Sequence, residues 1–191
     1  MNLTTPLGDE VLRLSAGERI TLSGTVYTAR DRAHARMCTQ GIPFNPQGAA
    51  IYHSGPIVCA DRIVAAGPTT SSRLDRYTGF LMDAGVRALI GKGGMGASSV
   101  AALQGRGVYL ACPGGCAPLA ASHMALEGVL WEDLGMAEAV WVIRLDRLPL
   151  IVGTDAHGGD LFSAVHAEAA RRYADAYGSG IASCRNPGPA D

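Results

Sequence analysis

The chain has 191 residues, 16 of them basic and 17 acidic, and 48% are hydrophobic. This length and apolar content suit one α/β domain with a substantial core, and the balanced charge argues against nucleic acid as a main partner. No run of 18 apolar residues occurs, and the N-terminus lacks the basic and apolar regions of a signal peptide. We therefore expect a cytoplasmic protein without membrane contact.

The sequence predicts alternating strands and helices. Alternation of apolar and polar residues indicates a strand over 19–27, and the polar, Ala-rich stretch after it indicates a helix over 28–40. Further strands are predicted over 50–53, 63–66, 86–90, 108–111, 139–145 and 150–153, and further helices over 72–84, 97–103, 117–127 and 160–177. We expect one domain over 1–178 and a disordered tail over 179–191, where Gly, Ser and Pro gather.

Lys92 is the only lysine of the chain, and it follows the predicted strand 86–90 within a run of glycines. A compact ammonium group in a chain that otherwise uses arginine indicates that a point charge is needed there. Such a loop can also serve only to reverse the chain. We favour the functional interpretation, in which the ammonium and exposed amides bind an anion.

The same loop matches G-x-G-x-x-G, which raises the possibility of a dinucleotide site. That pattern expects an acidic residue at the end of the next strand, but that strand is followed by Cys112 and no acid occurs before Glu127. The Walker pattern is not completed either. Nucleotide binding therefore stays a minor alternative.

Two further polar clusters lie at predicted helix starts. Arg30 and the backbone N–H groups near it could hold a carboxylate, although an ordinary N-cap with a solvated arginine explains this motif alone as well or better. Residues 69–72 are four consecutive hydroxyl side chains just before Arg73. One hydroxyl is enough for a cap, so the surplus indicates a polar pocket for an oxygen-rich anion.

The cysteines give little support for a disulfide framework or a zinc site. Their number is odd and no C-x-x-C pair occurs; they are Cys38, Cys59, Cys112, Cys116 and Cys184. A cluster held by three of them is a remote alternative, because small buried cysteines are common core residues. Free thiols are the simplest interpretation, and we predict no metal ligand on this chain.

Six sequence elements occur in one order over residues 19–162: Thr-Ala-Arg-Asp-x-Ala-His, Tyr-x-x-Gly-Pro, Gly-Pro-Thr-Thr-Ser-x-Arg-Leu-Asp, Ile-Gly-Lys-Gly, Leu-Gly-Met-x-Glu-Ala-Val-Trp and Asp-x-x-Gly-x-Asp-Leu-Phe. This set resembles the β subunit, equivalently the C-terminal domain, of class I fumarate hydratases and L-tartrate dehydratases. The resemblance implies a three-layer β/β/α swivelling domain, consistent with the two consecutive late strands. One departure is the stretch 113–116, where a Gly-Gly-x-Ala-like sequence is expected.

The family resemblance implies a hydro-lyase that hydrates fumarate to malate or dehydrates tartrate. It also implies a [4Fe-4S] cluster on a partner α subunit, whose open iron acts as a Lewis acid, so this chain alone is expected to be inactive. By resemblance, Arg30, Arg73 and Lys92 bind the substrate carboxylates and Thr69 transfers the proton. A threonine hydroxyl is weak by itself, so we expect a partner carboxylate to activate it.

The alternative from a different class is a non-catalytic module that binds a dicarboxylate or other anion and regulates a partner. The sequence does not choose between fumarate and tartrate, because the expected cage recognises the two carboxylates common to both. It predicts a hetero-oligomer with the α subunit.

Overall fold

The computed structural model of the chain describes residues 1–178. The chain divides into two compact units, Met1–Leu161 and Phe162–Asp191. No helix in the described part is long and apolar enough to cross a membrane. The tail predicted over 179–191 lies outside the described residues.

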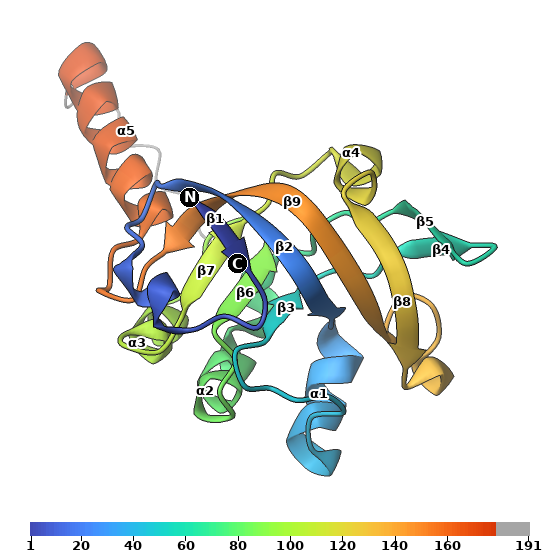
Figure 1. The fold of residues 1–191 in the computed structure, drawn as a ribbon. Helices are drawn as coiled ribbons and strands as arrows, with labels where there is room; N and C mark the ends of the chain where they lie inside the picture. Colours follow the sequence, from blue (N-terminus) through green and yellow to red (C-terminus); the bar gives the residue numbers. More distant parts are fainter. Residues whose placement is uncertain (179–191) are drawn as a thin grey trace, which may run out of the picture. The chain divides into compact units, whose positions relative to one another are not determined.

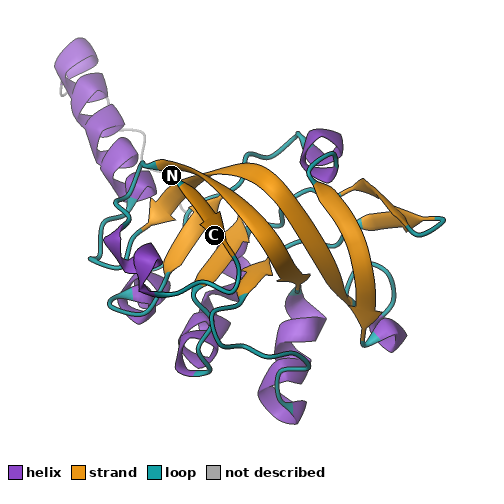
Figure 2. Cartoon of the chain, in the orientation of Figure 1, coloured by secondary structure: helices purple, strands orange, loops and turns teal. Residues whose placement is uncertain are grey.

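The described residues form a mixed α/β structure (Figures 1 and 2). Its strands are β1 (Asn2–Thr4), β2 (Arg19–Thr28), β3 (Ala50–Tyr52), β4 (Ile57–Cys59), β5 (Arg62–Ala65), β6 (Ala88–Gly91), β7 (Val108–Ala111), β8 (Met124–Leu130) and β9 (Val140–Thr154). Its α-helices are α1 (Asp31–Gln40), α2 (Asp75–Asp83), α3 (Ala97–Leu103), α4 (Ala117–Ala121) and α5 (Leu161–Tyr177). Three short 3-10 helices are η1 (Asp9–Arg13), η2 (Ser71–Leu74) and η3 (Glu132–Leu134).

Five strands pair in a closed ring. β2, β3, β6 and β7 are parallel neighbours in that order, and β9 pairs antiparallel with both β7 and β2. β1 joins β2 and β8 joins β9 as further strands, while β4 and β5 form a separate two-stranded sheet. Because β2, β3, β6 and β7 are parallel, their carboxyl ends lie at one edge, which is where ligands usually bind in α/β sheets.

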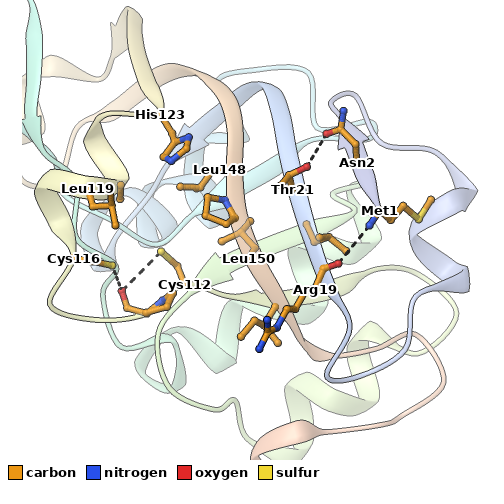
Figure 3. Close-up of a pocket in the computed structure, with 15 residues that line it drawn as sticks. Met1, Asn2, Arg19, Thr21, Cys112, Cys116, Leu119, His123, Leu148 and Leu150 are labelled. Atoms are coloured by element: carbon orange, nitrogen blue, oxygen red, sulfur yellow. Dashed lines mark hydrogen bonds between the residues drawn. The ribbon is translucent and has the colours of Figure 1, made fainter.

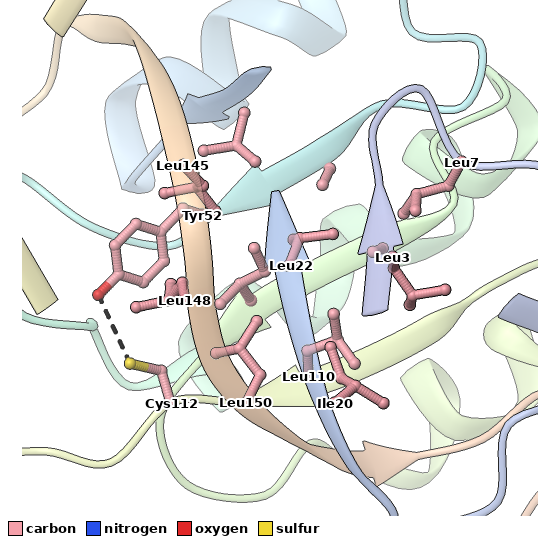
Figure 4. Close-up of a cluster of buried hydrophobic side chains, with 14 of the residues drawn as sticks. Leu3, Leu7, Ile20, Leu22, Tyr52, Leu110, Cys112, Leu145, Leu148 and Leu150 are labelled. Atoms are coloured by element: carbon pink, nitrogen blue, oxygen red, sulfur yellow. Dashed lines mark hydrogen bonds between the residues drawn. The ribbon is translucent and has the colours of Figure 1, made fainter. Parts of the chain in front are cut away.

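The parallel strands β3, β6 and β7 are buried on both faces, as expected when helices cover one of them. The side chains of Tyr52 and Leu110 point into a core that they share with β2 and β9 (Figure 4). Ile90 belongs to the same cluster. The alternate residues Leu89 and Tyr109 are also buried but lie outside that cluster. Figure 1 shows α1, α2 and α3 together on one side of these strands.

The predicted strands 139–145 and 150–153 are not separate, which corrects the sequence prediction. They are the two halves of β9, which runs unbroken for 15 residues. Arg147 has a positive φ of 48° where the register against β2 shifts, and its N–H donates to the Ser23 hydroxyl at 3.0 Å. A bulge of this kind absorbs one residue and lets a strand bend without ending.

The predicted helix 117–127 is also wrong in its second half. α4 ends at Ala121, and Met124 begins β8, which pairs antiparallel with β9. Ala, Met, Leu and Glu favour helix by intrinsic propensity. Pairing with a neighbouring strand outweighs that preference here, as tertiary context often does.

Thr28 closes the end of the β2–β9 ladder. Its side chain is fully buried, and its hydroxyl accepts the Trp141 main-chain N–H at 2.9 Å and reaches the Ala139 carbonyl at 3.4 Å. A buried N–H that loses its acceptor carries the whole desolvation penalty. The threonine of the Thr-Ala-Arg-Asp motif is therefore a structural residue.

We predict that Thr28→Val lowers the free energy of unfolding by about 1–3 kcal/mol, because the Trp141 N–H is left buried without an acceptor. Urea denaturation followed by circular dichroism measures the change. Thr25→Val is the matched control on the same strand, since the Thr25 hydroxyl bonds an exposed carboxylate, Glu127. Equal losses in the two variants would contradict the assignment.

Asp155 organises the turn between β9 and α5. Its carboxylate accepts three main-chain N–H groups, those of Ala16 at 2.9 Å, His157 at 2.9 Å and Gly159 at 2.8 Å. Burial acts to raise the pKa of Asp155, but these hydrogen bonds outweigh it and hold that pKa below its ordinary value. A group with a depressed native pKa stabilises the fold above its unfolded pKa, and this contribution is lost as the pH falls through the native pKa.

We predict that Asp155→Asn lowers the free energy of unfolding by about 1.5–3 kcal/mol at pH 7. The difference from the unsubstituted chain should shrink as the pH falls through the native pKa of Asp155, where the carboxyl itself becomes protonated. Urea denaturation at a series of pH values tests this. The exposed Asp146→Asn is the control, and a difference independent of pH would refute the prediction.

Candidate functional site

Thr69 lies between the carboxyl ends of two parallel strands. Its N–H donates to the His53 carbonyl after β3 at 2.6 Å, and its own carbonyl accepts the Lys92 N–H after β6 at 3.2 Å. The Ser71 N–H in turn donates to the Lys92 carbonyl at 3.1 Å, so Thr70 and Lys92 form an isolated parallel bridge. Main-chain pairing thus places the predicted proton-transfer residue beside the predicted lysine.

Arg30 stands at the N-cap position of α1, directly after β2. Its Nε lies 3.7 Å from a carboxylate oxygen of Glu138, and this Nε is buried without a hydrogen-bond partner. The other Glu138 oxygen accepts the Arg32 main-chain N–H at 2.8 Å. Glu138 therefore satisfies the start of α1 and holds Arg30 at the same edge as Thr69.

Arg73 is joined to the same helix start. Its Nη2 donates to Asp31 at 2.8 Å, and both side chains are about half exposed. Because exposed ion pairs contribute little net stability, an incoming carboxylate can replace Asp31 at low cost. The contact links the segment 69–73 to the start of α1.

The loop after Lys92 is anchored at several points. The Tyr109 hydroxyl donates to the Gly93 carbonyl at 2.8 Å, and the Asp75 carboxylate accepts the Gly96 N–H at 2.8 Å and the Ser99 hydroxyl at 2.8 Å. The Lys92 side chain itself is exposed, and the described residues give it no ion-pair partner. The loop thus presents a free ammonium group on a fixed backbone.

We call the start of α1 with Arg30, the segment 69–73 and the loop 91–96 the three site segments. The predicted substrate-binding cations on these segments are Arg30, Arg73 and Lys92, and the carboxylate partners of the two arginines are Asp31 and Glu138. Among these five groups, three positive charges less two negative ones leave a net charge of +1. The arrangement can therefore attract an anion and bind its oxygens from more than one side.

Two glycines permit the close approach of these segments. A Cβ on Gly55 would come within 2.5 Å of the Ala137 carbonyl oxygen and 3.0 Å of Cδ of Arg30. A Cβ on Gly91 would overlap the hydroxyl of Ser71. The glycines of Tyr-x-x-Gly-Pro and Ile-Gly-Lys-Gly are thus required by packing around the site.

Two histidines are buried behind the site segments. Both His34 and His53 are 1% exposed, and their rings lie edge to face with centroids 5.3 Å apart. Burial lowers the pKa of His34 to about 4, against opposing effects of the Arg30 carbonyl and the Asp31 charge. Burial, and then the neighbouring His34, also hold the pKa of His53 well below its ordinary value. Both imidazoles are neutral at physiological pH.

The four cysteines that the structure describes are not arranged to hold a metal cluster. All four are free thiols, Cys38, Cys59, Cys112 and Cys116, and the part of the chain that the structure describes has no group of three or more His, Cys, Asp or Glu side chains placed to hold a metal ion. Burial raises the pKa of Cys112, which disfavours the thiolate that a metal needs. Cys184 lies outside the described residues.

A cavity of about 660 Å³ opens elsewhere, beside β2, β9 and α4 (Figure 3). Its lining is largely apolar and includes Leu119, Leu148 and Leu150. None of the four predicted site residues lines it. Although Arg19 and Met1 also line it, a doubly charged anion would lose hydration against mostly apolar walls, so we place the candidate site at the carboxyl ends of the parallel strands instead.

The structure brings the segments of Arg30, Thr69, Arg73 and Lys92 to one edge, as the motifs led us to expect. Sequence reasoning gave no role to Asp75 or Glu138, although both stand inside the quoted motifs. Both are acidic residues within motifs that also contain arginines, and this could have indicated that they bind or orient the site segments. Ser71 was part of the hydroxyl run 69–72 that indicated a polar pocket, but its partners were not foreseen, and Tyr109 carried no signal, because their contacts depend on chain crossings that local pattern does not reveal.

Comparison with known proteins identifies the family. Residues 1–165 match the family model described as fumarase C-terminus. The chain is 40% identical over 172 residues to the L(+)-tartrate dehydratase subunit beta of Escherichia coli, which covers 84% of this chain and 86% of that protein. It is 37% identical over 175 residues to a putative L(+)-tartrate dehydratase subunit beta of Methanocaldococcus jannaschii, covering 82% and 88%.

A putative fumarate hydratase class I of Geobacillus stearothermophilus is 38% identical over 170 residues, which are 84% of this chain and 33% of that protein. The chain therefore belongs to the fumarase C-terminus family, and the resemblance inferred from the six motifs is confirmed. Its relatives carry the names of hydro-lyases, either as a separate β subunit or as part of a longer chain.

We predict that Gly91→Ala lowers the free energy of unfolding by about 1–3 kcal/mol, because the new methyl group displaces the Ser71 hydroxyl in a packed interior. Gly114→Ala is the matched control, since its Cβ would make only an ordinary contact with Lys92 Cδ at 3.5 Å. Denaturant unfolding measures both. A Gly91→Ala variant as stable as Gly114→Ala would show that the close packing at Ser71 is not required.

Proposed function

We propose that this chain is the β subunit of a hydro-lyase that adds water to, or removes it from, a four-carbon dicarboxylate. The observation that carries the proposal is the pairing of the Thr69 and Lys92 main chains, which brings a residue with a hydroxyl next to a residue with an exposed ammonium group, with two arginines on adjoining segments. Membership of the fumarase C-terminus family supports it.

In this proposal Arg30, Arg73 and Lys92 bind the two carboxylates of the substrate. The arginine forks offer paired donors to carboxylate oxygens, whereas the lysine offers a mobile point charge. The Arg73–Asp31 pair opens as the substrate carboxylate takes the place of Asp31. The anchored loop 91–96 keeps the dicarboxylate oriented toward the catalytic group. Holding two reacting groups in the right geometry supplies a large part of an enzyme's rate acceleration.

Thr69 in this proposal exchanges the proton at the carbon opposite the one that carries the hydroxyl. Among the described residues no hydrogen bond to the Thr69 hydroxyl is recorded, and a threonine hydroxyl needs a base to accept its proton. A carboxylate of the partner subunit supplies this base in our proposal. The chain is then inactive alone, as the sequence predicted.

We propose further that the [4Fe-4S] cluster implied by the family resemblance is carried by the partner α subunit, since the thiols described here do not fit it. The complex is then a hetero-oligomer, and we place it in the cytoplasm. The fold is proposed to be the three-layer β/β/α swivelling domain, which is supported by helices α1–α3, the parallel strands and the antiparallel group β2, β9 and β8. Identities of 40% and 38% do not separate tartrate from fumarate as substrate.

Anaerobic co-expression with a cluster-bearing α subunit, followed by assays of fumarate hydration and tartrate dehydration, tests the proposal. We predict that Thr69→Val lowers kcat by about 10²–10⁴-fold, the range typical of a lost proton-transfer group. Thr70→Val is the matched control, because Thr70 is the exposed neighbour in the same segment, and we expect it to keep most of the activity.

A cluster-loaded complex that turns over neither substrate would instead favour the non-catalytic anion-binding module. Equal activity of Thr69→Val and Thr70→Val would remove Thr69 from the proton transfer while leaving the hydro-lyase assignment intact. The two results therefore test the hydro-lyase assignment and the role of Thr69 independently.

A further inference from the structure

The buried histidine pair is hydrogen-bonded directly to two of the site segments, and it reaches the third, the lysine loop, through Ser71 and Tyr109. His34 Nδ1 lies 2.7 Å from the carbonyl oxygen of Arg30, one turn earlier in α1. A carbonyl can only accept, so Nδ1 of His34 carries the proton and its Nε2 is an acceptor. His34 thereby fixes the main chain of Arg30 at the start of α1.

His53 connects the other two segments. Its Nδ1 lies 2.9 Å from the Ser71 hydroxyl, while its main-chain N–H and carbonyl bond Ile90 and Thr69 at 2.7 and 2.6 Å. The Ser71 hydroxyl also bonds the Tyr109 hydroxyl: burial raises the pKa of Tyr109, and this hydrogen bond offsets part of the rise. Tyr109 in turn holds the carbonyl of Gly93 in the lysine loop.

The two imidazoles are packed against each other and against α2. His34 stacks on Tyr77 with ring centroids 5.2 Å apart, and its edge-to-face contact with His53 joins the α1 side to the strand side. The Nε2 atoms of both rings are buried without a hydrogen-bond partner among the described residues.

We propose that His34 and His53 are positioning residues of the anion site, which as a buried pair hold the three site segments in the arrangement that the dicarboxylate requires. The inference rests on the proposed function and adds two residues to it. Of the titratable groups, Asp31 of α1 and Tyr77 of α2 interact with His34, and the two imidazoles interact with each other.

Substitutions at His53 distinguish positioning from simple packing. In His53→Asn the side-chain amide stands near the place of Nδ1 and can keep the bond to Ser71, but the smaller residue leaves a void. In His53→Gln the volume is better kept, but the amide stands near the place of Nε2. A packing role therefore predicts that Gln is the better substitute, whereas a positioning role predicts that Asn is.

In the reconstituted complex, we predict that His53→Gln raises KM for the dicarboxylate about tenfold, the equivalent of one well-formed hydrogen bond. His53→Asn should stay within about threefold of the unsubstituted complex. The opposite order, or losses in thermal stability with KM unchanged in both variants, would overturn the proposal.

Amide hydrogen exchange on the full chain gives a readout that does not depend on activity. The Thr69 and Lys92 amides should exchange about tenfold faster in His53→Gln and at the unsubstituted rate in His53→Asn. That exchange pattern together with a complex that lacks turnover would leave the positioning role intact and refute the proposed reaction. Unchanged exchange in both variants would refute the positioning role even in an active enzyme.

Discussion

The hydrogen bonds of Thr69 to the ends of β3 and β6 are the constraint on which the site depends. His53 and Lys92 each follow a parallel strand. The His53 carbonyl and the Lys92 N–H can therefore form hydrogen bonds with one more extended segment, which is the one that contains Thr69. Thr69 is held by its main chain, so its hydroxyl stays free for chemistry. The carboxyl edge of the parallel strands thus fixes the positions of the proposed reactive residues.

The charges around this edge are only partly balanced. Glu138 and Asp31 accompany the two arginines, and they also serve the start of α1, where a negative charge is favoured by the helix dipole. Lys92 has no such partner in the described part of the chain. The cage is therefore held in shape by its own carboxylates while retaining a net positive charge for the dianion, and the lysine is the group most available to bind it.

The errors in the sequence prediction share one cause, which is pairing between distant segments. The residues of β8 have good helix formers among them, and only their ladder with β9 makes them a strand. The sequence predicted two strands, 139–145 and 150–153, on either side of Arg147, but the positive φ of Arg147 and its hydrogen bond to Ser23 let a single strand continue. By contrast, α3 over 97–103 and β7 over 108–111 have the predicted bounds, because their local patterns agree with their environment.

The sequence by itself determined the family, the α/β class and the placement of Arg30, Thr69, Arg73 and Lys92 at strand ends or helix starts, because local patterns and ordered motifs carry that information. Tertiary structure alone decided the closed ring of strands, the carboxylate partners of the arginines and the burial of the histidine pair. Each of these depends on which segments meet in space, and a contact across 18 or more residues leaves no local periodicity to read.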